Sequence, residues 1–150
     1  MSDLSQLYQE VILDHNKSPR NYRKCESCNH HSEGFNPLCG DHLWIYINLE
    51  EDKIKDISFQ GNGCAISKSS ASLMTSILKG KTKKEAEELF NTFHHVVTSK
   101  IGEEIDLSSL GKLAVFAGVR DYPARVKCAS LAWHTMLKAL NGEENFATTE

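Results

Sequence analysis

The chain has 150 residues, 40% of them hydrophobic and 25% charged, which is typical of a single globular domain with its own hydrophobic core. Its formal net charge of -3 argues against nucleic acid as a partner, because nucleic-acid-binding domains are usually basic. No apolar run is long enough to cross a membrane, and residues 1–10 lack the pattern of a secretory signal peptide. We therefore expect one domain over residues 1–150, located in the cytoplasm, with neither nucleic acid nor a membrane as partner.

The first half of the chain predicts one helix and then a small antiparallel sheet. Apolar residues at helical spacing indicate a helix over residues 3–17, and Pro19 ends it because proline disfavours a helical conformation in the residue before it. Alternation of apolar and polar residues indicates a strand over residues 42–49. A second arm follows at residues 54–59, where Ile54 is out of phase with the other apolar residues and so predicts a β-bulge.

The second half of the chain predicts helices that cover this sheet. The predicted elements of this half are helices at residues 64–79, 82–98, 110–119 and 121–140 and a disordered tail from about residue 143. Thr82 and Glu85 form a capping box at the start of one of these helices. The expected fold class is therefore α+β, with about three antiparallel strands packed against helices.

Three cysteines and one aspartate stand at the ends of the predicted elements. Cys39 and Asp41 share one turn, and Cys64 follows a Gly-Asn-Gly turn at the start of a helix, where free N–H groups and the helix dipole favour a thiolate. Cys128 lies near the start of the last helix. Three thiolates and a carboxylate complete a tetrahedral zinc set, so we predict that the four side chains bind one metal ion. Each cysteine alone is equally well explained as a small core residue.

Two cations lie next to the last of these cysteines. Arg125 is three residues before Cys128, on nearly the same helical face, and Lys127 directly precedes Cys128. Both could offset the negative charge that three thiolates and a carboxylate leave on a divalent metal. The simpler interpretation of the two cations is a solvated helix start.

A second cysteine pair lies in the polar segment before the sheet. Cys25 and Cys28 have Cys-x-x-Cys spacing, which together with nearby histidines can bind zinc. His30 and His31 follow too closely for a known zinc finger, and no core is expected around the pair, so a solvated loop is the favoured interpretation. Residues 30–35 could form a short edge strand. Five cysteines without an export signal argue against a disulfide framework and for metal binding or catalysis.

The three cysteine motifs, in this order, resemble the IscU/NifU N-terminal family of iron–sulfur cluster assembly proteins. They are residues 36–41 (Asn-Pro-Leu-Cys-Gly-Asp), 63–67 (Gly-Cys-Ala-Ile-Ser) and 125–129 (Arg-Val-Lys-Cys-Ala). Within the family the chain is most similar to the SufU type, because Lys127 stands where scaffold-type IscU proteins carry a histidine. The long interval between the second and third cysteines also fits the extra segment of SufU-type proteins, here near residues 99–119.

The resemblance implies a zinc site made of Cys39, Asp41, Cys64 and Cys128. It further implies that the protein carries persulfide sulfur from a SUF-type cysteine desulfurase to downstream iron–sulfur scaffold or acceptor proteins. In that scheme a histidine of the desulfurase replaces one thiolate on zinc, Cys39 accepts the sulfur and Arg125 assists, as in a zinc-dependent sulfurtransferase. The alternative is a non-enzymatic scaffold for iron or a transient [2Fe–2S] cluster on Cys39, Cys64 and Cys128. A purely structural zinc is the third interpretation.

Overall fold

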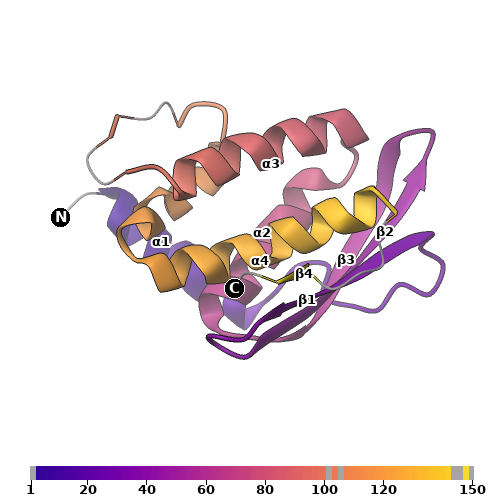
Figure 1. Cartoon of the computed structure of the whole chain (residues 1–150), viewed down its shortest axis with the longest axis horizontal. Helices are drawn as coiled ribbons and strands as arrows, with labels where there is room; N and C mark the ends of the chain where they lie inside the picture. The colour runs from indigo at the N-terminus through magenta and orange to yellow at the C-terminus, as the bar shows by residue number, and fades with distance from the viewer. Residues whose placement is uncertain (1–2, 101–102, 105–106, 143–146, 149–150) are drawn as a thin grey trace.

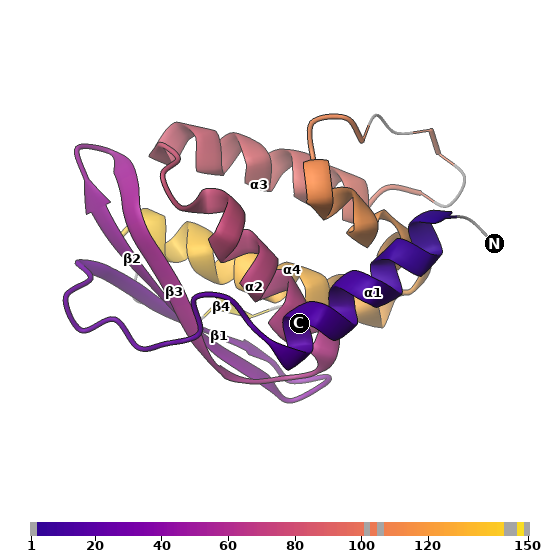
Figure 2. The same cartoon turned by 180° about the vertical axis from the view of Figure 1, so that it is seen from behind.

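The computed structural model describes residues 3–100, 103–104, 107–142 and 147–148. Figures 1 and 2 show the helices gathered on one side of a small sheet. In chain order the elements are α1 (Asp3–Lys17), β1 (His30–Asn36), β2 (Asp41–Glu50), β3 (Lys53–Asn62), α2 (Ala65–Leu78), α3 (Lys83–Val97), the 3₁₀ helix η1 (Gly111–Asp121), α4 (Pro123–Leu140) and β4 (Ala147–Thr148). None of the described helices combines the length and apolar character needed to cross a membrane.

Three antiparallel strands form the body of the sheet, which confirms the α+β prediction, and the strand order is β3-β2-β1-β4. The predicted bulge is present, because the register between β2 and β3 shifts after Asn48 so that Leu49 lies opposite Ile54. This shift places the out-of-phase Ile54 in the core, where its side chain is fully buried. The edge strand expected at residues 30–35 is β1, which pairs antiparallel with β2.

The fourth strand was not predicted. Ala147 and Thr148 of β4 pair parallel with Gly34 and Phe35 of β1. The prediction of a disordered tail is therefore wrong for these two residues, and the rest of the tail, 143–146 and 149–150, lies outside the described residues. An edge strand such as β1 presents unpaired backbone groups, and β4 satisfies some of them.

Small side chains let α2 and α4 approach each other over the sheet. Ser70 of α2 is fully buried, and its hydroxyl donates to the carbonyl of Ala129 at 2.6 Å. The indole N–H of Trp133 donates back to the Ser70 hydroxyl at 3.2 Å, and the Trp133 ring stacks on Phe93 with centroids 4.6 Å apart. This contact fixes the two helices that carry Cys64 and Cys128 at or near their N-terminal ends.

The predicted element ends differ from the structure in a few places. The capping box of Thr82 and Glu85 is present as expected, but Cys64 is the N-cap of α2 and not its first helical residue. β3 runs through Gly61, where a break was expected, because glycine lets the carbonyl of His42 approach to a point that a Cβ would occupy. The short helix at residues 110–119 is the 3₁₀ helix η1, and its apolar side chains are buried.

Two histidines, the buried His15 and the half-buried His134, make stability depend on pH. The Nδ1 atom of His15 lies 2.7 Å from the Ser72 hydroxyl, and His134 packs against Phe90 and His94 with ring centroids 5.3 and 5.4 Å away. Burial lowers the pKa of both His15 and His134, and the nearby charge of His94 lowers that of His134 further. The unfolded chain, with histidine pKa values near 6.5, therefore binds protons more readily than the folded protein.

We expect the free energy of unfolding to be constant above a pH of about 6.5 and to fall as the pH drops below that value. Denaturant unfolding at a series of pH values measures this slope. The slope should decrease in His134→Gln, while His95→Gln, which changes an exposed histidine on α3, should leave it unchanged. An equal slope in wild type and His134→Gln would show that folding does not lower the pKa of His134.

Candidate metal centre

The four predicted ligands lie together at the end of the sheet where β1 turns into β2 and where α2 and α4 begin. The Sγ atoms of Cys39 and Cys128 are 3.3 Å apart, and one ligand atom each from Cys39, Asp41 and Cys128 lies within 4.8 Å of the other two. Cys64 joins the group through its Sγ atom, 3.9 Å from Oδ2 of Asp41. Residues far apart in sequence thus meet at one point.

This donor set fits a tetrahedral metal ion. Zinc–sulfur bonds of about 2.3 Å separate two sulfur ligands by about 3.8 Å, and zinc–oxygen bonds are slightly shorter. The observed 3.3 Å between the sulfurs of Cys39 and Cys128 and 3.9 Å between the sulfur of Cys64 and the carboxylate oxygen are close to these separations. The Cys64 sulfur lies outside the group of three atoms that are within 4.8 Å of one another, so it must move closer to complete the set. Thiolates also bind iron and iron–sulfur clusters, so the same side chains could bind a zinc ion, an iron ion or a cluster.

The turn between β1 and β2 holds Cys39 outward. The side-chain oxygen of Asn36 accepts from the backbone N–H of Leu38 at 3.2 Å, and its carbonyl accepts from the N–H of Gly40 at 2.8 Å. Gly40 has a φ of 73°, a left-handed conformation that favours glycine. These features place Cys39 at the tip of a tight turn, where its side chain is exposed, while Cys64 is half-buried and Cys128 is buried.

Backbone and amide groups hold the Asp41 carboxylate in the centre. The N–H of Cys64 donates to Oδ1 of Asp41 at 2.8 Å. The fully buried amide of Asn36 lies 3.3 Å from Oδ2 of Asp41 and 3.7 Å from Sγ of Cys128. A Cβ at Gly63 would lie only 3.0 Å from the same carboxylate, so the absence of a side chain at Gly63 lets the Asp41 carboxylate occupy this position. Asn36 and Gly63 lie within the motifs at residues 36–41 and 63–67, but their contacts with Asp41 and Cys128 are not predictable from local sequence.

The proton distribution at the centre is uneven. A hydrogen bond from Cys128 lowers the pKa of the Cys64 thiol to about 7, against the effect of burial, and the N–H of Ser67 assists from 3.4 Å. The same shared proton, together with burial, raises the pKa of Cys128. Without metal, Cys64 therefore loses its proton more readily than Cys128, in agreement with the position of Cys64 at a helix N-terminus.

Two buried hydroxyls border the centre. Among the described residues, the hydroxyl groups of Tyr8 and Ser67 are buried without a hydrogen-bond partner. Burial raises the pKa of Tyr8, and the charges of Arg125 and Cys64 act on the same phenol, so it lies within electrostatic reach of the centre. Both hydroxyls are donors that a bound thiolate or persulfide could use, and neither was expected from the sequence.

Arg125 lies on α4, three residues before Cys128. Its guanidinium group sits over the ring of Tyr122, 4.3 Å from the centroid, and its side chain is exposed. Within the described residues it forms no hydrogen bond to a thiol. Its assisting role stays a prediction.

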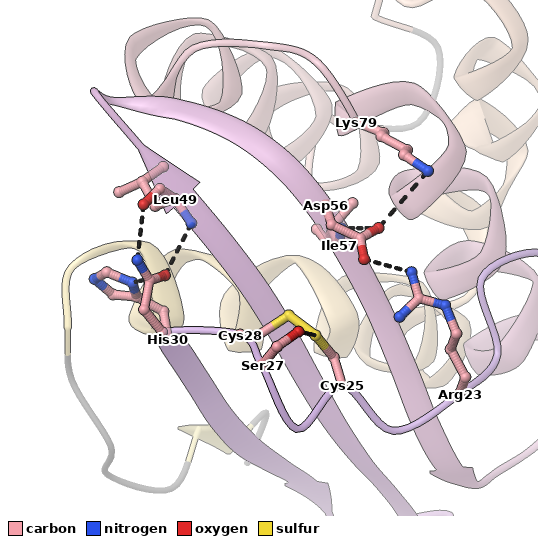
Figure 3. Close-up of a disulfide and its surroundings, with 10 residues drawn as sticks. Arg23, Cys25, Ser27, Cys28, His30, Leu49, Asp56, Ile57 and Lys79 are labelled. Carbon is pink, nitrogen blue, oxygen red and sulfur yellow. Dashed lines mark hydrogen bonds and ion pairs between the residues drawn. A yellow bond between two sulfur atoms is a disulfide. The ribbon is translucent and has the colours of Figure 1, made fainter.

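The second cysteine pair differs from the sequence interpretation. Cys25 and Cys28 form a disulfide, with Cα atoms 5.5 Å apart, and Cys25 is buried (Figure 3). The segment before them is held to the sheet edge, where the N–H of Arg23 donates to the carbonyl of Phe59 at 2.9 Å. The expectation of a solvated loop without a core around it is therefore wrong here, and so is the argument against disulfides for this pair. The neighbouring acid is Asp56, and neither His30 nor His31 joins the cluster.

The fold and the centre define a small α+β domain that presents three thiols and a carboxylate at one end of its sheet. Residues 7–129 match the family model of the NifU-like N terminal domain. The chain belongs to this family, which is an iron–sulfur cluster assembly family.

Relatives of both subtypes are similar to the chain. The iron–sulfur cluster assembly scaffold protein IscU of Streptococcus pyogenes serotype M1 is 37% identical, over 97% of this chain and 89% of the relative. The zinc-dependent sulfurtransferase SufU of Bacillus subtilis (strain 168) is also 37% identical, over 95% of each chain. The crystal structure of FiSufU from Fervidobacterium islandicum AW-1 is 38% identical and has a TM-score of 0.81, covering 90% of this chain and 97% of its own.

Removing the amide that holds the centre should weaken metal binding. In Asn36→Ala, Oδ2 of Asp41 and Sγ of Cys128 lose their buried donor. We expect the zinc affinity to fall about 10- to 100-fold, as for other groups that orient metal ligands. Competition with a chromophoric chelator measures this change. Asn29→Ala is the matched control, because Asn29 bonds the backbone of Leu49 elsewhere, and an equal loss in both variants would contradict the assignment.

Proposed function

We propose that the protein is a zinc-dependent acceptor and carrier of persulfide sulfur in iron–sulfur cluster biogenesis, working in the cytoplasm with a SUF-type cysteine desulfurase. The observation that carries this proposal is the unequal exposure of three neighbouring thiols. Cys39 is exposed at the tip of its turn, whereas Cys64 is half-buried and Cys128 is only 4% exposed. Only Cys39 offers its sulfur freely to a macromolecular partner.

The transfer is a thiol exchange at sulfur. The Cys39 thiolate attacks the outer sulfur of the persulfide on the desulfurase, the sulfur–sulfur bond of that persulfide breaks, and the cysteine thiolate of the desulfurase leaves. The extra sulfur atom is then held as a persulfide on Cys39. A bound zinc ion would keep the thiolates of the centre deprotonated until they are used. Cys64, Cys128 and Asp41 remain as ligands, since they lie on β2 and at the helix starts, while Cys39 lies in a turn.

The choice of subtype is supported by residues of this chain. Lys127 stands where scaffold-type IscU proteins carry a histidine, as in the SufU type. The extra segment of SufU-type proteins, near residues 99–119, includes η1, and its apolar side chains such as Leu113 and Phe116 are fully buried in the core. The chain is 37% identical to both the IscU and the SufU relative, so overall identity does not separate the subtypes and the proposal depends on these individual residues. Arg125, exposed three residues before Cys128, would offset the charge of the incoming persulfide. Downstream iron–sulfur scaffold or acceptor proteins would receive the sulfur.

A cluster scaffold is the second candidate, because the sulfurs of Cys39 and Cys128 converge with the Asp41 carboxylate, the sulfur of Cys64 lies 3.9 Å from that carboxylate, and the relative from Streptococcus pyogenes is named as a scaffold. A cluster with an aspartate ligand would be held less firmly and passed on more easily. In this alternative a [2Fe–2S] cluster, or iron, is cargo on Cys39, Cys64 and Cys128.

Desulfurase turnover separates the two functions. We expect zinc-loaded protein to raise the rate at which the cognate desulfurase consumes cysteine, with the metal-free protein as control. Under anaerobic conditions, iron and sulfide should leave no stable cluster on the wild type. A stable cluster in Asp41→Ala that is transferred to an acceptor, together with no rise in desulfurase turnover, would favour the scaffold.

A further inference from the structure

The disulfide between Cys25 and Cys28 lies far from the metal centre. Figure 3 shows it in front of the strands of the sheet, with the helices behind them. The acid beside it, Asp56 on β3, pairs with Asn48 on β2. Asp41 belongs to the metal centre, and Asn48 lies opposite the acid beside the disulfide. The strand between Asp41 and Asn48 spans about 23 Å at the usual rise per residue, so the disulfide and the metal centre are separate sites.

Three potential metal ligands converge at the disulfide. One atom each from Cys25, Cys28 and Asp56 lies within 4.8 Å of the other two. The two cysteines have the spacing of a zinc knuckle. A disulfide alone needs no acid beside it, whereas the Asp56 carboxylate supplies a third ligand of a type that zinc accepts.

The Asp56 carboxylate is oriented and still has room for a metal. Its Oδ2 atom accepts from the Arg23 guanidinium at 2.5 Å, and its Oδ1 atom accepts from the N–H of Ile57 at 3.0 Å and lies 3.7 Å from the Lys79 ammonium (Figure 3). A carboxylate offers about four acceptor positions, so one remains. Arg23 and Lys79 also supply positive charge where two thiolates and a carboxylate would gather. Cys28 is half-buried and Cys25 is buried, so an attacking thiol reaches Cys28 first.

We propose that Cys25, Cys28 and Asp56 form a second, redox-gated site for a thiophilic divalent metal such as Zn²⁺. A cellular dithiol reductant opens the site. One of its thiolates attacks Sγ of Cys28, Cys25 leaves as a thiolate, and the second thiol of the reductant then displaces Cys28. The reductant becomes a disulfide and supplies two electrons and two protons, and the metal later displaces both protons. Two thiolates and the carboxylate bind the metal with water as fourth ligand, whereas the disulfide form binds none.

The test uses the full chain with Cys39, Cys64 and Cys128 replaced by serine, so that only the second pair can bind metal through sulfur. The protein is reduced with a phosphine, freed of it anaerobically, and titrated with Co²⁺, whose thiolate charge-transfer absorption reports sulfur ligation. We expect one equivalent on the reduced protein and none after reoxidation. Further replacement of Cys25 and Cys28 by serine should abolish the absorption. Reduced protein with two titratable thiols that binds no Co²⁺ would overturn the proposal and leave a thiol–disulfide couple only.

Two comparisons keep the test decisive. Asp56→Asn should weaken Co²⁺ binding about tenfold or more, whereas Glu26→Gln, which removes an exposed carboxylate between the two cysteines, should not. If the triple serine variant does not fold, native mass spectrometry of the reduced, zinc-loaded protein replaces it. The otherwise wild-type chain should then carry one more zinc ion than the variant with Cys25→Ser and Cys28→Ser. Equal zinc content in these two proteins would contradict the second site.

Discussion

Replacing Cys39 by alanine is expected to abolish the stimulation of the desulfurase while the chain stays folded. Cys39 is exposed at the tip of a turn, so its loss leaves no cavity in the core. The stimulated rate of cysteine consumption should fall about a hundredfold or more, because removing a nucleophile removes the covalent route itself. The other two thiols of the centre are too recessed to replace it, since Cys128 is only 4% exposed.

Leu38→Ala is the matched control for this result. Leu38 is 61% exposed beside Cys39, and its truncation changes the same turn without touching a thiol. We expect this variant to keep most of the stimulation. Stimulation that survives in Cys39→Ala would show that sulfur is accepted elsewhere. Unfolding of Cys39→Ala would instead support zinc as a purely structural staple.

Removing the metal is expected to cause the second large effect, a loss of stability. The ligands come from the turn after β1, from β2 and from the starts of α2 and α4, so the metal binds only when these elements are in place. With free zinc about 1,000-fold above its dissociation constant, binding adds about 4 kcal/mol to the free energy of unfolding. In a chain of this length that corresponds to roughly 10 °C in Tm. Thermal unfolding with and without a chelator measures it.

A pair of isosteric variants identifies the source of this stabilisation. Asp41→Asn removes the charge of a fully buried ligand and should remove most of the difference between zinc-loaded and metal-free protein. Asp52→Asn makes the same chemical change in the exposed turn between β2 and β3, and this variant should keep the full difference in stability between zinc-loaded and metal-free protein. Equal midpoints with and without chelator in the wild type would mean that zinc does not bind the folded centre.

Local patterns were enough to predict most of the fold. Alternation located β2, the out-of-phase Ile54 located the bulge, and the residues at positions 82 and 85 located the start of α3. β4 could not be found in this way, because two residues have no periodicity and their pairing with β1 joins distant parts of the chain. Gly61 was misjudged for a related reason, since its conformation serves a close approach by His42 on the neighbouring strand.

The candidate centre was predictable only in part. Its four candidate ligands were predicted because each stands at the end of an element in an unusual local setting, and the structure places them near one another. The roles of Asn36 and Gly63 depend on distances to Asp41 and Cys128, which no single stretch of sequence contains. The second cysteine pair shows the same limit, because its third ligand comes from β3 and not from the nearby histidines.

The most direct test of the account is to locate the transferred sulfur. Zinc-loaded protein is incubated with the desulfurase and cysteine under anaerobic conditions, then separated, digested and analysed by mass spectrometry after alkylation. We predict the mass of one additional sulfur atom on the peptide that carries Cys39 and none on the peptides of Cys64 and Cys128. Protein that gains no sulfur at Cys39, yet assembles a cluster on the three cysteines when iron is supplied, would contradict the sulfur-carrier function and establish the scaffold in its place.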